Sequence, residues 1–118
     1  MRLRDKVALI SGAASGMGAA TAKLFASEGA IVFATDLDES TGLEVVEEIN
    51  AAGHSAHFIK LDVSRDDDWQ AAVSEVTDTY GRIDVLVNNA GISGSHPDQM
   101  NTATWDEQMN VYAKGVFL

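Results

Sequence analysis

The stretch Ser11-Gly-Ala-Ala-Ser-Gly-Met-Gly18 has three glycines within seven residues, between the apolar run Val7-Ala-Leu-Ile10 and a helical pattern that begins at Gly16. Glycine inside a regular element costs about 0.5–1 kcal/mol relative to alanine. Three glycines where a strand passes into a helix therefore indicate that another group comes very close to the backbone. The arrangement predicts a strand–turn–helix unit whose turn binds a ligand.

Composition limits the class of protein. The 118 residues are 46% hydrophobic and 22% charged, which is typical of one soluble globular domain. The formal net charge of −10 argues against nucleic acid or anionic membranes as partners. Cysteine is absent, which excludes disulfides and thiolate metal sites and favours a reducing compartment, so we expect a cytoplasmic protein. No apolar run approaches the ~18 residues of a membrane span, and His54, His57 and His96 have no spacing suited to a shared metal.

Apolar β-branched runs alternate with helical patterns along the chain. The expected strands are Lys6–Ser11, Ala30–Asp36, Ala56–Leu61 and Ile83–Asn88, and the expected helices are Gly16–Ser27, Glu39–Ala52, Asp66–Tyr80 and Ala103–Leu118. Short, almost continuously apolar strands are typical of a parallel sheet covered on both faces. Strand–helix alternation indicates right-handed βαβ units. We predict an α/β fold with a doubly wound, Rossmann-like parallel sheet and strand order 3-2-1-4 over residues 1–118.

The expected helices have capping residues at their ends. Asp38 and Ser64 are predicted N-caps. Gly29 and Gly53 follow the helices where left-handed C-terminal caps occur. In the helix over 39–52, a three-residue spacing predicts an inner face formed by Leu43, Val46 and Ile49.

The ligand crevice of such a sheet opens where the strand order reverses, at the carboxyl ends of the first and fourth strands. Gly12 permits a tight turn there, and Gly16 and Gly18 let a pyrophosphate and then the helix itself pack against bare backbone. The helix N-terminus adds free N–H groups and a positive dipole end for the phosphates. No Lys-Ser/Thr pair follows the last glycine, so the stretch is not a P-loop.

Asp36 supplies the second element of a dinucleotide site. It closes the second strand, eighteen residues after Gly18, where a carboxylate can accept hydrogen bonds from an adenosine ribose. It would also repel a 2′-phosphate, and neither Thr35, Leu37 nor Ser15 is basic. The sequence therefore favours NAD over NADP.

The segment Gly12-Ala-Ala-Ser-Gly16-Met-Gly18 resembles the Gly-x-x-x-Gly-x-Gly fingerprint of the short-chain dehydrogenase/reductase family. Leu61-Asp62-Val63 stands where the family's Asp approaches the adenine ring. Asn88-Asn89-Ala90-Gly91 is similar to the family's Asn-Asn-Ala-Gly motif, which steadies the sheet and lines the crevice. The candidate cofactor-binding residues are Gly12, Ser15, Gly16, Met17, Gly18, Asp36, Leu37, Asp62, Val63, Asn89, Ala90 and Gly91.

The resemblance implies an NAD-dependent oxidoreductase that interconverts a secondary alcohol and a ketone by hydride transfer, and a homo-oligomeric parent. Family members use Ser, Tyr-x-x-x-Lys and an Asn, but neither Tyr80 nor Tyr112 has a lysine four residues later. We expect the Ser–Tyr–Lys segment beyond Leu118, with the chain truncated in its fourth helix and inactive alone. The register of Gly115-Val116-Phe117 puts Tyr112 at the family's Asn position, so no catalytic residue is assigned.

Two alternatives remain. The chain could be a complete, non-catalytic module that binds a dinucleotide, although its apolar C-terminus, Val116-Phe117-Leu118, speaks against this. A methyltransferase that uses S-adenosylmethionine also has a glycine loop and an acidic residue after its second strand. That class does not explain Asn88-Asn89-Ala90-Gly91.

Overall fold

A computed structural model describes residues 2–89 of the chain. The expected helix over 103–118 and the expectations for Ala90, Gly91 and Tyr112 lie outside these residues.

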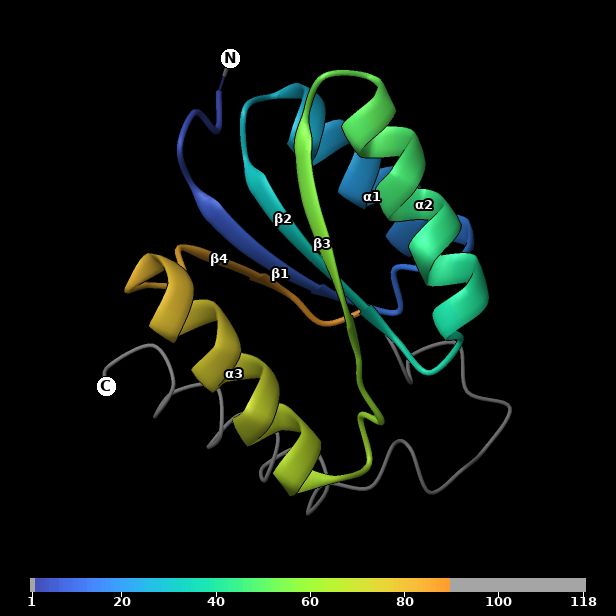
Figure 1. Cartoon of the computed structure of the whole chain (residues 1–118), viewed down its shortest axis with the longest axis vertical. Helices are drawn as coiled ribbons and strands as arrows, with labels where there is room; N and C mark the ends of the chain where they lie inside the picture. The colour runs from blue at the N-terminus through green and yellow to red at the C-terminus, as the bar shows by residue number, and fades with distance from the viewer. Residues whose placement is uncertain (1, 90–118) are drawn as a thin grey trace.

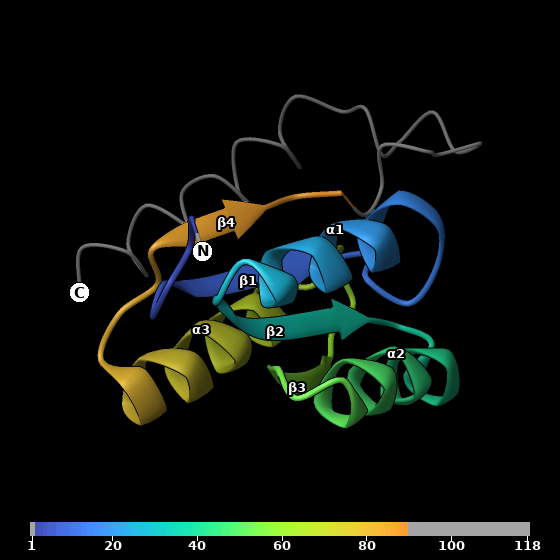
Figure 2. The same ribbon diagram turned by 90° about the horizontal axis from the view of Figure 1, so that it is seen from above.

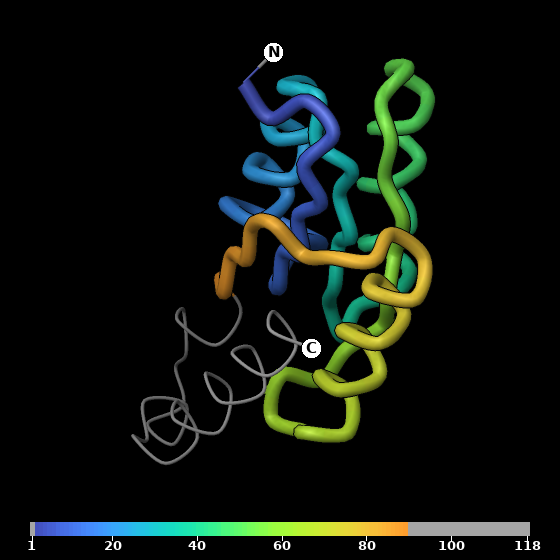
Figure 3. Tube along the Cα trace, turned by 90° about the vertical axis from the view of Figure 1, so that its left-hand side faces the viewer, coloured from blue at the N-terminus to red at the C-terminus, as the bar shows by residue number. Residues whose placement is uncertain are grey.

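The described residues alternate between strand and helix throughout (Figures 1 and 3). The elements are β1 (Val7–Ser11), α1 (Gly16–Ser27), β2 (Ile31–Asp36), α2 (Glu39–Ala51), β3 (Ser55–Lys60), α3 (Asp66–Tyr80) and β4 (Val85–Val87). The predicted bounds of α1 and α3 are confirmed, whereas β3 begins and ends one residue earlier than predicted and β4 is shorter. Gly29 and Gly53 have φ angles of 97° and 88°, which confirms the left-handed conformation expected after α1 and α2.

The sheet has the strand order β3-β2-β1-β4. β1 pairs in parallel with both β2 and β4, and β2 pairs in parallel with β3. This confirms the predicted doubly wound order. Because all strands run in one direction, their carboxyl ends meet at one edge of the sheet, and the order reverses between β1 and β4.

Helices cover both faces of the sheet (Figures 1 and 2). Successive strand residues point to opposite faces, so each strand contributes to two cores. With α1 and α2, one core contains Ala8, Ile10, Val32, Ala34 and Ala56. With α3, the other contains Val7, Leu9, Phe33, Leu61 and the fully buried Trp69.

The predicted inner face of α2 is wrong at Leu43, which is 49% exposed. The buried residues of α2 are Gly42, Val45, Val46 and Ile49, which follow the i, i+3, i+4, i+7 spacing of a 3.6-residue period. Gly42 belongs to this face because a Cβ there would lie 2.1 Å from the ring of Phe58 on β3. The aromatic ring fills the space that a side chain at position 42 would need, and this sets the rotation of the helix.

The N-cap prediction is confirmed for Asp38 and wrong for Ser64. Asp38 accepts hydrogen bonds from the Thr41 backbone N–H (3.1 Å) and hydroxyl (2.9 Å). The N-cap of α3 is instead Arg65, which makes no side-chain capping bond. The Ser64 hydroxyl donates to Oδ1 of Asp62 at 2.6 Å, and a charged acceptor of this kind is stronger than a neutral one.

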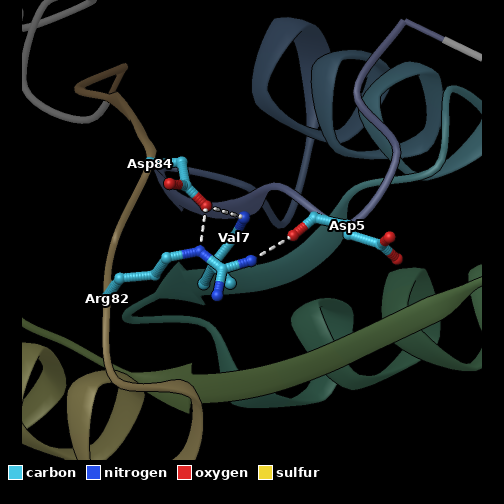
Figure 4. A network of polar contacts seen from close by, with 4 residues as sticks. All are labelled: Asp5, Val7, Arg82 and Asp84. Atoms are coloured by element: carbon cyan, nitrogen blue, oxygen red, sulfur yellow. Dashed lines mark hydrogen bonds and ion pairs between the residues drawn. The ribbon is translucent and has the colours of Figure 1, made fainter.

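A polar network holds the opposite edge of the sheet, where β1 and β4 begin (Figure 4). Oδ2 of Asp84 accepts from the Val7 N–H (2.8 Å) and from Nε of Arg82 (2.9 Å). Nη2 of Arg82 also donates to the carbonyl of Asp5 at 2.6 Å. The Val7 N–H, and to a smaller extent Arg82, hold the pKa of the Asp84 carboxyl below its ordinary value.

Candidate functional site

The candidate site lies at the carboxyl edge of the sheet. The loops that follow β1, β2 and β3, and Asn88-Asn89 after β4, all reach this edge because the strands are parallel. The loops after β1 and β4 flank the point at which the strand order reverses. The sheet therefore brings together segments that are up to about eighty residues apart in the chain.

The glycines after β1 are required for two different structural reasons. Gly12 and Gly16 have φ angles of 65° and 58°, which side-chain-bearing residues rarely adopt. A Cβ on Gly16 would meet nothing within 4 Å, whereas a Cβ on Gly18 would lie 1.9 Å from the carbonyl oxygen of Gly12. Gly16 thus serves the turn, and Gly18 lets the first turn of α1 pack directly on the backbone of that turn.

Among the described helices, only α1 has neither a side-chain capping bond nor an acidic residue in its first turn. Ser15, its N-cap, makes no side-chain capping bond, and its first turn has no acidic residue. The first N–H groups of a helix have no partner within the helix. The first turn of α2, by comparison, contains Glu39, and that of α3 contains Asp66, Asp67 and Asp68. Ser15 and Met17 are exposed beside this uncompensated positive end.

Asp36 lies beside the same loop. Its Oδ2 accepts from the Ala14 N–H and its Oδ1 from the Asp38 N–H, each at 3.0 Å. The next residue, Leu37, is 57% exposed. Lys60, opposite Asp36 in the β2–β3 register, is exposed. No ion pair joins Lys60 to Asp36 within residues 2–89.

The loop after β3 is held by the first turn of α3. Asp68 accepts the Asp62 backbone N–H at 2.8 Å, and Nε1 of Trp69 donates to the carbonyl of Val63 at 3.0 Å. Hydrogen bonds from the Ser64 hydroxyl and then from its N–H lower the pKa of the Asp62 carboxyl. Asp62 and Val63 therefore occupy a well-defined position at this edge.

Sequence reasoning missed Ser11, which connects β1 to the end of β4. Its hydroxyl donates to Oδ1 of Asn88 and accepts the N–H of Asn89, both at 3.0 Å. Asn89 also lies close to Gly18, because a Cβ on that glycine would be 2.9 Å from the Asn89 Nδ2 atom. The available sequence signal was a single serine that ends an otherwise apolar strand, and the structure shows it only 1% exposed.

Most of the predicted site residues lie around one corner of the sheet. Gly12 to Gly18 follow β1, Asp36 and Leu37 lie at the end of β2, Asn89 follows β4, and Asp62 and Val63 lie in the loop after β3. Within residues 2–89, no group of three or more His, Cys, Asp or Glu side chains is placed to hold a metal ion. In the same part of the chain, none of the helices combines the length and the hydropathy that a membrane span requires.

Residues 6–118 match the family model described as short chain dehydrogenase. The chain belongs to the short-chain dehydrogenase family. Cyclopentanol dehydrogenase of Comamonas sp. (strain NCIMB 9872) is 41% identical over 118 residues, which are 99% of this chain and 47% of that protein. The chain thus spans about half the length of this curated relative.

Solved structures of short-chain dehydrogenases share the fold. One from Burkholderia phymatum, in complex with NAD, has a TM-score of 0.84 at 29% identity and covers 98% of this chain and 46% of its own. A metagenomic short-chain oxidoreductase in complex with NADP has a TM-score of 0.81 at 34% identity, with 99% and 57% covered. Since one neighbour holds NAD and the other NADP, the choice between them depends on this chain's own residues.

Proposed function

We propose that the whole protein is an NAD-dependent oxidoreductase that interconverts a secondary alcohol and a ketone. In this proposal the described residues form the dinucleotide-binding part. The Ser and Tyr-x-x-x-Lys segment lies beyond Leu118, in the half of the relatives' length that this chain does not span. The bound nicotinamide would supply or accept the hydride, and the residues described here would bind and orient the dinucleotide.

The observation that carries the proposal is the bare backbone at the start of α1. Gly18 packs so closely on Gly12 that no side chain fits between them, and the space at Gly16 is open. The adjoining helix end has neither an acidic residue in its first turn nor a side-chain cap. Free N–H groups and a positive dipole at such an end favour a phosphate group. The residues present therefore fit a pyrophosphate at Gly16 to Gly18.

The remaining predicted contacts surround this position. Asp36 would accept the adenosine ribose hydroxyls, and the exposed side chain of Leu37 would contact the cofactor beside it. Asp62 and Val63 would contact the adenine ring from the loop after β3. Asn89, beside Gly18, would line the crevice toward the nicotinamide end, together with Ala90 and Gly91.

The preference for NAD is proposed from the charge at Asp36. Two unit charges 4 Å apart near a protein surface interact by about 4 kcal/mol, so a 2′-phosphate beside this carboxylate is strongly disfavoured. Ser15 and Leu37 offer no positive charge. Lys60 is the cation opposite Asp36 in the sheet register, and its exposed ammonium group is screened by water and salt. The carboxylate therefore dominates the selection.

The test is the ratio of dissociation constants for NAD and NADP, measured on the complete protein. Asp36→Ala should shift this ratio toward NADP by at least about tenfold, or 1.4 kcal/mol, and adding Leu37→Arg should shift it further. Asp38→Asn is the matched control, because it removes one negative charge at the same edge without removing Asp36. An unchanged ratio in Asp36→Ala would contradict the ribose assignment.

The proposed reaction has its own test. The complete protein is mixed with NAD and secondary alcohols, beginning with cyclopentanol because a 41% identical relative is a cyclopentanol dehydrogenase. NADH formation, followed by absorbance, is the expected result. Tight NAD binding without NADH formation from any alcohol, and without ketone reduction, would favour a non-catalytic binding module. We further propose that the protein is cytoplasmic and forms a homo-oligomer, and sedimentation of the complete protein tests the oligomeric state.

A further inference from the structure

Both oxygens of the Asp36 carboxylate are engaged by backbone groups in the described structure. Oδ2 accepts the N–H of Ala14, and Oδ1 accepts the N–H of Asp38. Ala14 is only 4% exposed, and a buried N–H without an acceptor is costly. Asp36 therefore connects the glycine loop to the turn after β2.

This bond is the last in a series that ties the loop to β2. The hydroxyl of Thr35, which is fully buried, donates to the carbonyl of Ile10 at 3.0 Å. The Ala13 N–H then donates to the carbonyl of Thr35, also at 3.0 Å. At Ala14 the acceptor changes from backbone to side chain, so the position of the loop at this point depends on which residue occupies position 36.

We propose that Asp36 is a positioning residue for the glycine loop, in addition to its proposed contact with the ribose. By holding the Ala14 N–H, its carboxylate sets where the N–H groups of Gly16 to Gly18 meet the pyrophosphate. The expected effect of this contact on dinucleotide binding rests on the proposed function. A carboxylate has about four acceptor positions, and two are used here, so the remaining ones stay available to ribose hydroxyls.

The first experiment needs no cofactor. Amide hydrogen exchange at Ala14 is measured by NMR in the unliganded complete protein, for the wild type, Asp36→Ala and the control Asp38→Asn. Loss of a hydrogen bond to a charged acceptor should make exchange at Ala14 at least about tenfold faster in Asp36→Ala. Asp38→Asn should leave it unchanged, because that side chain contacts Thr41 and not the loop.

The second experiment separates loop positioning from ribose recognition. The probe is an NAD analogue whose adenosine ribose lacks both the 2′- and the 3′-hydroxyl. If Asp36 acts only on these hydroxyls, Asp36→Ala leaves the affinity for the analogue unchanged or, because a negative charge near the phosphates is removed, raises it. If it also positions the loop, the analogue binds about tenfold more weakly to the variant. Removing a negative charge near the phosphates would by itself strengthen binding. A weaker affinity of the variant for the analogue therefore cannot result from the lost charge.

The outcomes are distinguishable. Unchanged exchange at Ala14 in Asp36→Ala, or an unchanged or higher affinity for the analogue, overturns the positioning role. Faster exchange at Ala14 in a protein that binds neither NAD nor NADP supports the contact and refutes the proposed function. If Asp36→Ala does not fold, Asp36→Leu is used: its side chain has a similar size and no hydrogen-bond acceptor, so the Ala14 and Asp38 amides must both lose protection if the carboxylate holds them. Full protection at both amides overturns the proposal.

Discussion

Replacing Gly18 by alanine tests the close packing of α1 on the glycine turn. The added Cβ would lie 1.9 Å from the carbonyl oxygen and 2.7 Å from the carbonyl carbon of Gly12, and 2.9 Å from Nδ2 of Asn89. The first two are backbone atoms and cannot rotate away. To reach an ordinary contact of about 3.5 Å, the helix and the turn would have to separate by about 1.6 Å.

The expected loss of stability follows from two opposing effects. Forcing extra volume into a packed site costs about 1–3 kcal/mol, and backbone contacts favour the upper end of this range. Alanine gains up to about 1 kcal/mol over glycine in a helix. The net expectation for Gly18→Ala is a free energy of unfolding lower by about 2 kcal/mol.

Urea denaturation and NAD titration of the complete protein are the two assays. A displacement of this size moves the N–H groups at the start of α1 away from the proposed phosphate position, so NAD affinity should fall along with stability. Gly53→Ala is the control. Its φ of 88° makes it costly, by about 1–2 kcal/mol, but it lies after α2, away from the site, and a Cβ there meets nothing within 4 Å. It should lose stability and keep its NAD affinity.

Unchanged stability in Gly18→Ala would show that α1 does not pack on Gly12 as described. Lower stability with unchanged NAD affinity would keep the packing and refute the placement of the pyrophosphate at this turn. Equal losses of affinity in Gly18→Ala and Gly53→Ala would show that the effect on binding is only a consequence of general destabilisation.

Two further predictions concern side chains that form hydrogen bonds in the core or at the edge of the sheet. The pKa of Asp84 is lower in the folded than in the unfolded chain, so its contribution is complete above the ordinary value of 3.8 and is lost as the pH falls through the lower folded value. The single oxygen of Asp84→Asn can still accept from Val7 and Arg82. Between about pH 5 and pH 2, the variant should therefore lose less free energy of unfolding than the wild type, as measured by urea denaturation. Parallel pH curves for the two proteins would contradict this. Trp69→Phe removes the donor to the Val63 carbonyl and part of a fully buried ring. The free energy of unfolding should therefore fall by about 1–3 kcal/mol. An unchanged urea midpoint would refute the contribution of this contact.

The order of elements and the place of the glycine turn could be predicted from sequence because local signals decide them. Apolar β-branched runs, the glycines and Asp38 each act within a few residues of their own position, so periodicity and capping rules apply. The parallel order then follows from the short strand–helix–strand connections. The same reasoning placed Asp36 at the site edge, since it closes the second strand.

The rotation of α2 depended on a contact with another element, and the N-cap of α3 depended on which of two local hydrogen bonds Ser64 forms. Leu43 and Val45 both fit an apolar stripe, and the ring of Phe58 against Gly42 selects which of them is buried. Ser64 fits an N-cap, but the neighbouring carboxylate of Asp62 takes its hydroxyl. In each case the sequence allowed two arrangements of similar local energy.

The sequence by itself determined that a glycine turn joins the first strand to the first helix and that a carboxylate closes the second strand. Only the tertiary structure decided that Ala14 donates to this carboxylate, that Ser11 connects the ends of β1 and β4, and that Lys60 stands opposite Asp36. The physical reason is that hydrogen bonds and register between strands depend on how the sheet assembles, whereas turns and caps depend on a few adjacent residues.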